Sequence, residues 1–232
     1  MNESQAGCDP DRWRAVDAYI EDLYIAGDAV AARVLEHQRE AGLPDIAVSP
    51  AQGKLLEVLA RSIGARRALE FGTLGGYSTQ WLARVIPAGG KVVSFELEPR
   101  HAEVAMASLT EAGLADKVEI RVGPAIDNLH TLDGDEPYDM VFIDADKPSN
   151  LAYYEAAMTR VRSGAIVVVD NVVRGGELVD PDSPDERVRG SRAVVERVAR
   201  DERISATVIQ TVGAKDYDGM IIGTVLEGGT VS

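Results

Sequence analysis

The sequence predicts an α/β protein built on a mainly parallel sheet, and three observations support this class. Short apolar segments alternate with helical segments from Arg67 onward, as in β-α-β units with right-handed crossovers. The first apolar segment ends in a glycine-rich turn that opens directly into a helix. The last two strand-like segments are joined by a link too short for a crossover, so these strands must run antiparallel.

The N-terminal part is predicted to be a helical cover over residues 11–64, after a loose polar tail at 1–10. Between 11 and 40, apolar residues recur at three- and four-residue steps, as on one face of a helix. The pattern ends at Gly42. Ser49 is a suitable N-cap and Pro50 suits the first helical position, so a further helix begins there. We expect the cover and a core at 65–226 to form a single domain over 1–232.

The core is predicted from alternating segments, which are listed in chain order. Strands are expected near 67–71, 91–96, 117–122, 138–143 and 164–169, and helices near 77–86, 99–112, 124–131, 149–162 and 189–201. Residues 204–211 and 219–226 are both strand-like, with a short loop around Lys215 between them. The last strand is therefore predicted to be antiparallel to its neighbour.

Composition and charge exclude several classes of function. The chain has 232 residues, of which 45% are hydrophobic, and this suits one domain with a sizeable core. The net charge of −14 comes without a basic stripe, so a small molecule is a better partner than nucleic acid or an anionic membrane. No run of about 18 apolar residues and no signal peptide is evident. Cys8 is the only cysteine and forms no intrachain disulfide, so we expect the cytoplasm as the location.

The glycine-rich turn at 72–76 is the first candidate binding feature. It points backbone N–H groups and a helix N-terminus at a ligand above the preceding strand. Glu96 ends the next strand, 24 residues after Gly72, where an acid binds a ribose diol. The spacing breaks the dinucleotide pattern G-x-G-x-x-G, and Glu70 disfavours a nearby pyrophosphate. S-adenosylmethionine, with a cationic amine and no pyrophosphate, fits better, although such a turn can also serve only to pack strand against helix.

Polar side chains follow the fourth and fifth predicted strands. Asp144 ends one of them, and Asp170 and Asn171 end the other. Two carboxylates and an amide oxygen suit magnesium, manganese or calcium rather than zinc. Taken singly, Asp144 fits a helix N-cap and the other two fit a turn, but together they favour a catalytic metal site. Lys147, three residues after Asp144, is a candidate general base beside that metal.

Other titratable and aromatic residues receive no role in this prediction. His37, His101 and His130 are scattered along the chain, and the last two fall within predicted helices. The pair Tyr153 and Tyr154 is expected in the core or at a subunit contact rather than in catalysis.

Four segments together carry a specific resemblance to a known family. They are EFGTLGGYS at 70–78, VGPA at 122–125, FIDADK at 142–147 and VVDNVVRGG at 168–176. Over about residues 11–226 the chain resembles the metal-dependent class I O-methyltransferases of the catechol and caffeoyl-CoA type, in their bacterial branch. The resemblance implies a Rossmann-like, seven-stranded, mostly parallel sheet with an antiparallel last strand and helices on both faces. It also implies S-adenosylmethionine, a divalent metal with Mg²⁺ first and Mn²⁺ or Ca²⁺ as alternatives, and a homodimer.

The resemblance assigns roles to particular residues. The cofactor would contact Val48, Glu70, Gly72, Ser78, Glu96, Ala125 and Asp144. Within that set, Glu96 would hold the ribose hydroxyls and Ala125 would lie at the adenine. The metal would be held by Asp144, Asp170 and Asn171. Lys147 would be the base, with Asp144 as its catalytic neighbour.

The predicted function is therefore methyl transfer from S-adenosylmethionine to a hydroxyl group of a small vicinal diphenol. An NAD-dependent oxidoreductase on the same sheet is one alternative, which the broken glycine spacing and Glu70 disfavour. A non-catalytic binding protein on a methyltransferase scaffold is the other. The acids and Lys147 at the strand ends disfavour it, because a pure binder needs no open metal site.

Overall fold

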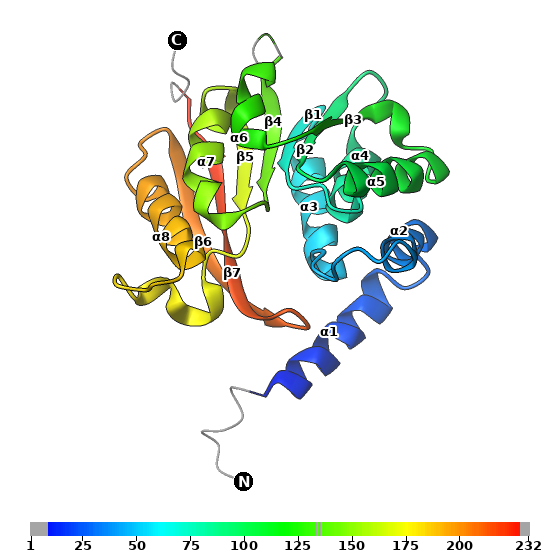
Figure 1. Ribbon diagram of the computed structural model, residues 1–232, viewed down its shortest axis with the longest axis horizontal. Helices are drawn as coiled ribbons and strands as arrows, with labels where there is room; N and C mark the ends of the chain where they lie inside the picture. The colour runs from blue at the N-terminus through cyan, green and yellow to red at the C-terminus, as the bar shows by residue number, and fades with distance from the viewer. Residues whose placement is uncertain (1–8, 133, 135, 228–232) are drawn as a thin grey trace.

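The computed structural model describes residues 9–132, 134 and 136–227, and in this part of the chain seven strands form one sheet with helices on both faces (Figure 1). The strands are β1 (Arg67–Phe71), β2 (Lys91–Glu96), β3 (Val118–Val122), β4 (Tyr138–Ile143), β5 (Val161–Val169), β6 (Ile204–Gly213) and β7 (Asp216–Val225). The longer helices are α1 (Pro10–Tyr24), α2 (Ala29–Glu40), α3 (Pro50–Ser62), α4 (Tyr77–Val85), α5 (Pro99–Glu111), α7 (Asn150–Met158) and α8 (Glu186–Val198). The short ones are η2 (Ala115–Lys117), α6 (Ala125–Asn128), η3 (Leu129–Leu132), η4 (Lys147–Ser149) and η5 (Arg174–Val179).

The strand order is β3-β2-β1-β4-β5-β7-β6. Strand β1 pairs in parallel with β2 on one side and with β4 on the other. Strand β7 lies between β5 and β6 and is antiparallel to both, which confirms the predicted antiparallel last strand. The order reverses between β1 and β4, so the carboxyl ends of these two strands flank the topological switch point where open α/β sheets bind ligands.

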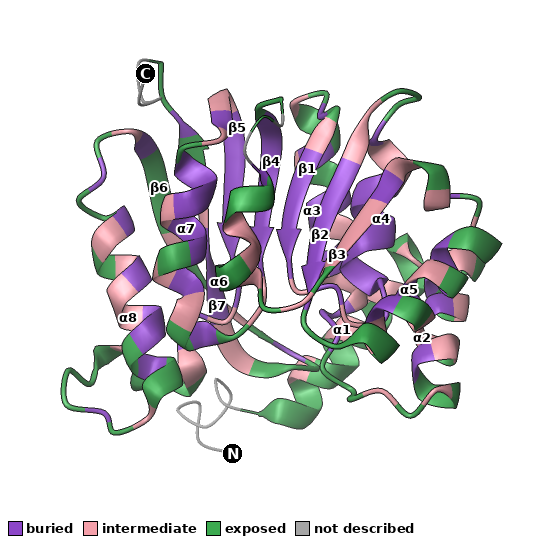
Figure 2. Ribbon diagram, turned by 45° about the horizontal axis from the view of Figure 1, so that its top comes forward, coloured by how far each residue is buried: buried purple, intermediate pink, exposed green. Residues whose placement is uncertain are grey.

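Each face of the sheet carries its own apolar core, and the strands between them are buried (Figure 2). One core joins the sheet to α7 and α8 and contains the fully buried Tyr154. The other joins it to α3, α4 and α5 and contains the fully buried Trp81. Because both faces are covered at β1, β2, β4 and the second half of β5, these strands are mainly apolar, which is the pattern that predicted them. Among the described helices, none is both long and apolar enough to cross a lipid bilayer.

The N-terminal cover differs from the prediction because the periodic segment at 11–40 forms two helices. Helix α1 already begins at Pro10, with Asp9 as its N-cap, so only residues 1–8 of the predicted loose tail, including Cys8, remain, and they lie outside the described residues. The chain turns at Gly27, whose φ is +82°. Asp28 then caps α2 by accepting a hydrogen bond from the N–H of Ala31 at 2.9 Å. The helical spacing of apolar residues continues across this turn, so the spacing by itself does not predict the break between the two helices.

The boundary between α7 and β5 also differs from the prediction. The helix expected to reach residue 162 ends at Met158, and β5 begins at Val161. The first residues of β5 pair with the start of β4, where the N–H of Tyr138 donates to the carbonyl of Arg160 at 2.8 Å. This pairing extends the strand at the expense of the helix. It is a contact between distant segments that a local pattern does not contain.

Candidate active site

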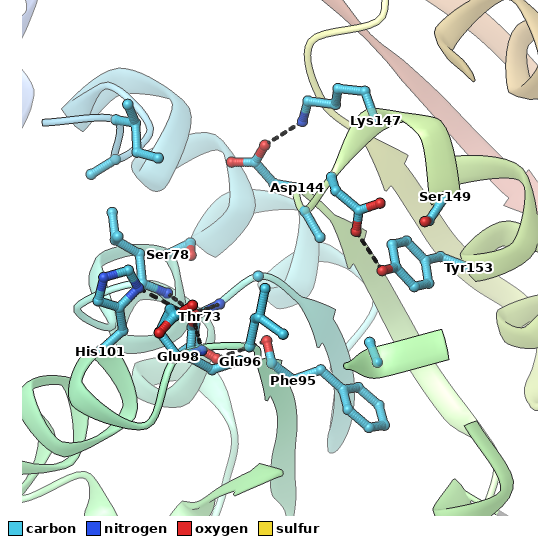
Figure 3. Close-up of a pocket in the computed structure, with 18 of the residues that line it drawn as sticks. Thr73, Ser78, Phe95, Glu96, Glu98, His101, Asp144, Lys147, Ser149 and Tyr153 are labelled. Carbon is cyan, nitrogen blue, oxygen red and sulfur yellow. Dashed lines mark hydrogen bonds and ion pairs between the residues drawn. The ribbon is translucent and has the colours of Figure 1, made fainter. Parts of the chain in front are cut away.

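A cavity of about 780 Å³ opens at the carboxyl ends of the parallel strands, beside the switch point between β1 and β4. Eight of the predicted site residues line it, namely Val48, Gly72, Ser78, Glu96, Ala125, Asp144, Lys147 and Asn171. Figure 3 shows Thr73, Glu96 and His101 gathered on one side of the cavity and Asp144 with Lys147 on another. Two predicted residues, Glu70 and Asp170, are not part of its lining. Both are buried, with exposures of 0% and 2%.

The glycine-rich turn between β1 and α4 forms the floor of the cavity. Gly72 has a φ of +97° and Gly76 a φ of +85°, conformations in which an L side chain is strained. A Cβ atom at Gly72 would lie 2.2 Å from the carbonyl oxygen of Asp144. The glycine therefore permits the carboxyl ends of β1 and β4 to approach each other, besides leaving room for a ligand. This approach carries Asp144 to the cavity wall next to the turn.

Glu96 holds the turn against the end of β2. One of its carboxylate oxygens accepts from the N–H of Leu74 at 2.7 Å and from that of Thr73 at 3.2 Å. The other accepts from the N–H of Glu98 at 2.9 Å and lies 3.2 Å from Nδ1 of His101. Several donors thus orient this carboxylate rigidly at the cavity wall. Each oxygen has two lone pairs, so the group still has capacity for hydroxyl donors of a ligand.

Glu70 lies below the turn and is fully buried. The hydroxyl groups of Thr79 and Ser94 donate to one of its oxygens at 2.5 and 2.6 Å. The other oxygen has no hydrogen bond of good geometry in the described part of the chain. Burial raises the pKa of Glu70 to about 7, against the lowering effect of the hydroxyl donors, to which the nearby hydroxyl of Ser78 adds. An orphaned buried carboxylate oxygen is a suitable partner for a cationic amine.

Asp144, Lys147, Asp170 and Asn171 come together where β4 and β5 end. The ammonium nitrogen of Lys147 is 2.6 Å from a carboxylate oxygen of Asp144. Asp170 is 2% exposed, and burial together with the negative charge of Asp144 raises its pKa to about 7. Asn171 has a φ of +56°, and its N–H donates to the carboxylate of Asp170 at 2.8 Å. The turn expected at this position and the clustering of polar groups are therefore both present.

The donor set at this point fits a hard divalent cation. The charge of Asp144 raises the cost of ionising Asp170, and a positive ion bound between the two carboxylates would offset that cost. An amide oxygen and two carboxylates are ligands of the kind that Mg²⁺ and Ca²⁺ accept. Across residues 9–132, 134 and 136–227, no group of three or more His, Cys, Asp or Glu side chains is arranged to hold a metal. The fit therefore depends on Asn171 as the third protein ligand.

Val48 and Ala125 close the cavity at two other places. Val48 precedes the Ser49 capping box of α3, in which the Oγ of Ser49 accepts from the N–H of Gln52 at 3.2 Å. The predicted N-cap is thereby confirmed. Ala125 begins α6 directly after β3. Both residues are small or apolar, so they leave room for a flat ligand.

Residues to which the sequence gave no role in the site also line the cavity, among them Gln38, His101 and Tyr153. His101 contacts Glu96 from the first turn of α5. The Tyr153 hydroxyl donates to Asp146 at 2.6 Å, and its ring stacks on Phe71 with centroids 4.7 Å apart. Tyr153 and Tyr154 both belong to the apolar core, as predicted, and Tyr153 lines the cavity as well. The position of His101 five residues after Glu96 is the one local signal that could have pointed to it.

Comparisons with known proteins agree with this geometry. The O-methyltransferase family profile matches residues 28–223. A catechol O-methyltransferase of Mycobacterium tuberculosis (strain ATCC 25618 / H37Rv) is 48% identical over 210 residues, which are 90% of this chain and 94% of that protein. A catechol O-methyltransferase of Niastella koreensis is 42% identical over 215 residues, covering 92% of this chain and 97% of that protein.

Solved structures give the same result. The O-methyltransferase TomG of Streptomyces achromogenes, involved in tomaymycin synthesis and solved in complex with S-adenosylmethionine, is 48% identical, with a TM-score of 0.90 over 97% of this chain and 100% of that chain. An O-methyltransferase of Bacillus cereus, in complex with S-adenosylhomocysteine, is 46% identical, with a TM-score of 0.91 over 94% and 100%. The family match, the relatives and the fold lead to one conclusion: the chain belongs to the O-methyltransferase family.

Proposed function

We propose that this protein transfers the methyl group of S-adenosylmethionine to a hydroxyl group of a small vicinal diphenol and requires a divalent cation. The observation that carries the proposal is the presence of two different polar clusters in one cavity, around Glu96 and around Asp144. A volume of about 780 Å³ falls in the range of ~300–1,000 Å³ typical of small-molecule sites. It leaves room for two reactants side by side.

The cluster at Glu96 is the proposed site for the nucleoside part of S-adenosylmethionine. Glu96 would accept from the ribose hydroxyls, and Ala125 would lie against the adenine. Gly72, Ser78 and Val48 would surround the methionine part. Glu70 and Asp144 would supply negative charge to its amine, which the buried and orphaned oxygen of Glu70 supports. S-adenosylmethionine, the second substrate, contributes a sulfonium-bound methyl group.

The cluster at Asp144 is the proposed metal and acceptor site. Asp144, Asp170 and Asn171 would hold the cation, with Mg²⁺ ahead of Mn²⁺ or Ca²⁺ because all three donors are hard oxygen atoms. A bound divalent cation lowers the pKa of a phenol and fixes two adjacent oxygens. Lys147 is 8% exposed and Asp170 is 2% exposed, so both charged groups have little contact with solvent.

Lys147 is the proposed general base. Asp144 holds the Lys147 side chain at the cavity wall through the 2.6 Å contact. Its ammonium form would be destabilised beside a bound divalent cation, and the neutral amine would take the proton of the acceptor hydroxyl. The acceptor oxygen then forms a bond to the methyl carbon while the carbon–sulfur bond breaks, which leaves a neutral thioether. Holding both reactants in one cavity removes much of the entropic barrier to this displacement.

Family membership argues against the two alternatives, an NAD-dependent oxidoreductase and a non-catalytic binder.

Assembly is a separate part of the proposal. All of α1 is described and none of its residues is buried. Val16, Tyr19, Leu23 and Tyr24 are exposed on it, so we propose that this helix contributes to a homodimer. A single domain over 1–232 and a cytoplasmic location remain predictions from the sequence.

Three measurements test the proposed function. Calorimetric titration should show binding of S-adenosylhomocysteine and none of NAD. Methyl transfer to catechol should require Mg²⁺ and stop when a chelator is added. Lys147→Ala should still bind S-adenosylhomocysteine while turnover falls by about 10²–10⁴-fold, the usual contribution of a general base. Turnover that persists in excess chelator would contradict the metal requirement. Tight binding of NAD without any binding of S-adenosylhomocysteine would contradict the whole proposal.

A further inference from the structure

Gln38, on the cover helix α2, has an unusual environment at the wall of the cavity. Its side chain is 4% exposed, and its amide nitrogen has no hydrogen-bond partner among the described residues. Such a donor destabilises a folded protein unless something accepts from it. The nitrogen itself is shielded from solvent, but Gln38 belongs to the lining of the cavity, so rotation of its amide toward a bound ligand would supply the missing acceptor.

Location distinguishes Gln38 from the other orphaned groups. Buried side-chain atoms without a partner also occur, within the described ranges, on Glu70, Gln80, Trp81, Asn150 and Arg174. Of these side chains, that of Gln38 alone lines the cavity. Gln80 is its natural counterpart, because it is the same residue type, fully buried and unpartnered, but lies on α4 away from the lining.

The glycine turn is shaped to receive the Gln38 side chain. A Cβ atom at Gly75 would lie 2.2 Å from Cγ of Gln38 and 2.6 Å from its amide nitrogen. The amide therefore lies against the backbone of the turn. On one side of Gly75 is Leu74, whose N–H binds Glu96, and on the other side is the start of α4 with Ser78. The amide nitrogen thus sits between the proposed ribose and methionine positions.

We propose that Gln38 is a cofactor-binding residue, whose amide N–H donates a hydrogen bond to an oxygen of the S-adenosyl ligand. The proposal rests on the proposed function, since it presupposes that this ligand enters the cavity. Two kinds of oxygen in this ligand can accept a hydrogen bond from a neutral amide, namely a ribose hydroxyl and the carboxylate of the methionine part. Ligand binding would then complete a hydrogen bond that the free protein lacks, and the N-terminal cover would take part in cofactor recognition.

The test compares Gln38→Met with Gln80→Met, because methionine keeps the length of the side chain and removes its donor. Calorimetric titration with S-adenosylhomocysteine should show a dissociation constant about tenfold higher for Gln38→Met and an unchanged one for Gln80→Met. The free Gln38→Met protein should unfold at the wild-type temperature or above it, since an orphaned polar group has been removed. Weaker binding together with undiminished stability is a result that a purely structural glutamine would not produce.

A second ligand identifies the accepting oxygen. 5′-Methylthioadenosine keeps the ribose and lacks the amino-acid carboxylate. If Gln38→Met weakens its binding as much as that of S-adenosylhomocysteine, the acceptor is the ribose. If its binding is unchanged, the acceptor is the carboxylate. Gly75→Ala adds a methyl group that displaces the Gln38 amide, so it should also weaken the binding of S-adenosylhomocysteine. The double variant should lose no more affinity for this ligand than either single variant.

Wild-type affinity for S-adenosylhomocysteine in both Gln38→Met and Gly75→Ala would overturn the assignment. Failure of the wild-type protein to bind this ligand is a different result. It would contradict the proposed function itself, and the Gln38 proposal with it.

Discussion

Glu70 and Glu96 stand at the ends of neighbouring strands, yet the fold places their carboxylates in opposite surroundings. Glu96 accepts from several donors at the wall of the cavity. Glu70 is fully buried, and one of its oxygens has no partner within the described ranges. The same side chain is therefore a rigid acceptor in one place and a group with a pKa near 7 in the other.

Glu70 makes stability depend on pH near neutrality. Its folded pKa of about 7 is raised above the ordinary 4.5, so the folded protein retains a proton that the unfolded chain loses between these values. Its favourable contribution is complete below pH 4.5 and is lost as the pH rises through 7. The Glu70→Gln variant has no proton to lose at this position, so its stability should not fall in this way. Its free energy of unfolding minus that of the wild type should therefore rise by about 3 kcal/mol between pH 5 and pH 8.

Urea unfolding of both proteins at several pH values measures that difference. Asp170 also has a raised pKa, but it is present in both proteins and cancels in the comparison. Parallel curves for Glu70→Gln and wild type would show that Glu70 is already ionised in the folded protein.

Asp170 allows a test of the metal site that does not depend on turnover. Added Mg²⁺ should raise the melting temperature of the wild-type protein, because a ligand that binds the folded state stabilises it. Asp170→Asn should abolish this shift and also methyl transfer, while S-adenosylhomocysteine affinity stays unchanged. Asp146→Asn is the control, because Asp146 lines the same cavity but is not a proposed ligand. An equal Mg²⁺ shift in all three proteins would remove Asp170 from the metal site.

At the scale of elements, the turn between β1 and α4 joins architecture to chemistry. The turn orients the N-terminus of α4, positions Glu96 through two backbone N–H groups and lies against the backbone at Asp144. One short segment thus touches both polar clusters of the cavity. A change in its backbone should affect folding and ligand binding together.

The Gly72→Ala substitution tests how far the stability of the fold depends on the close approach of this turn to the backbone at Asp144. The residue combines a positive φ with a Cβ position 2.2 Å from the Asp144 carbonyl, so the substitution should cost about 2–5 kcal/mol of unfolding free energy through strain and overpacking. Gly89 is the matched control, because its φ is +79° and nothing lies within 4 Å of its Cβ position. Gly89→Ala should cost about 1 kcal/mol from strain alone. If thermal or urea unfolding shows the same loss of stability for both variants, then the close approach of β1 to β4 does not account for the need for glycine at position 72.

At the scale of the whole molecule, the two cores hold the sheet between them and α1 stands apart. Figure 1 shows α1 beside the end of the β6–β7 hairpin rather than on the sheet. Asp17 of α1 accepts there from the N–H of Ala214 at 2.6 Å. Trp13 and Ile20 of α1 are half-buried, while Val16, Tyr19, Leu23 and Tyr24 remain exposed.

The proposed homodimer predicts what happens when those residues are changed. Leu23→Glu together with Tyr24→Glu places charges on side chains that are 59% and 72% exposed, so the fold should persist while the dimer dissociates. Val179→Glu is the control, since Val179 is 83% exposed on η5. Light scattering should give a dimer for the wild type and for Val179→Glu and a monomer for the double variant. A wild-type monomer across a wide concentration range would end the proposal.

The sequence by itself determined the strands, the glycine turn and the residues at the strand ends. These features are local, because burial of both faces makes each core strand an apolar run and a positive φ favours glycine. Parallel strands have their carboxyl ends at one edge of the sheet, so the residues that follow β4 and β5 must lie near each other. Chain order and strand direction are therefore sufficient to assign Asp144 and Asn171 to one site.

Only the tertiary structure decided which distant groups share that site and how each is solvated. Gln38 reaches the cavity because α2 packs near the turn, and nothing in its own segment distinguishes it from a surface glutamine. Glu70 is buried by groups from α4 and β2, so its pKa depends on contacts that no local pattern contains. The early start of β5 has the same origin, whereas the break at Gly27 has a local cause, a glycine with positive φ followed by the Asp28 N-cap. Spacing within a segment predicts that segment, but burial and hydrogen-bond partners come from segments far away along the chain.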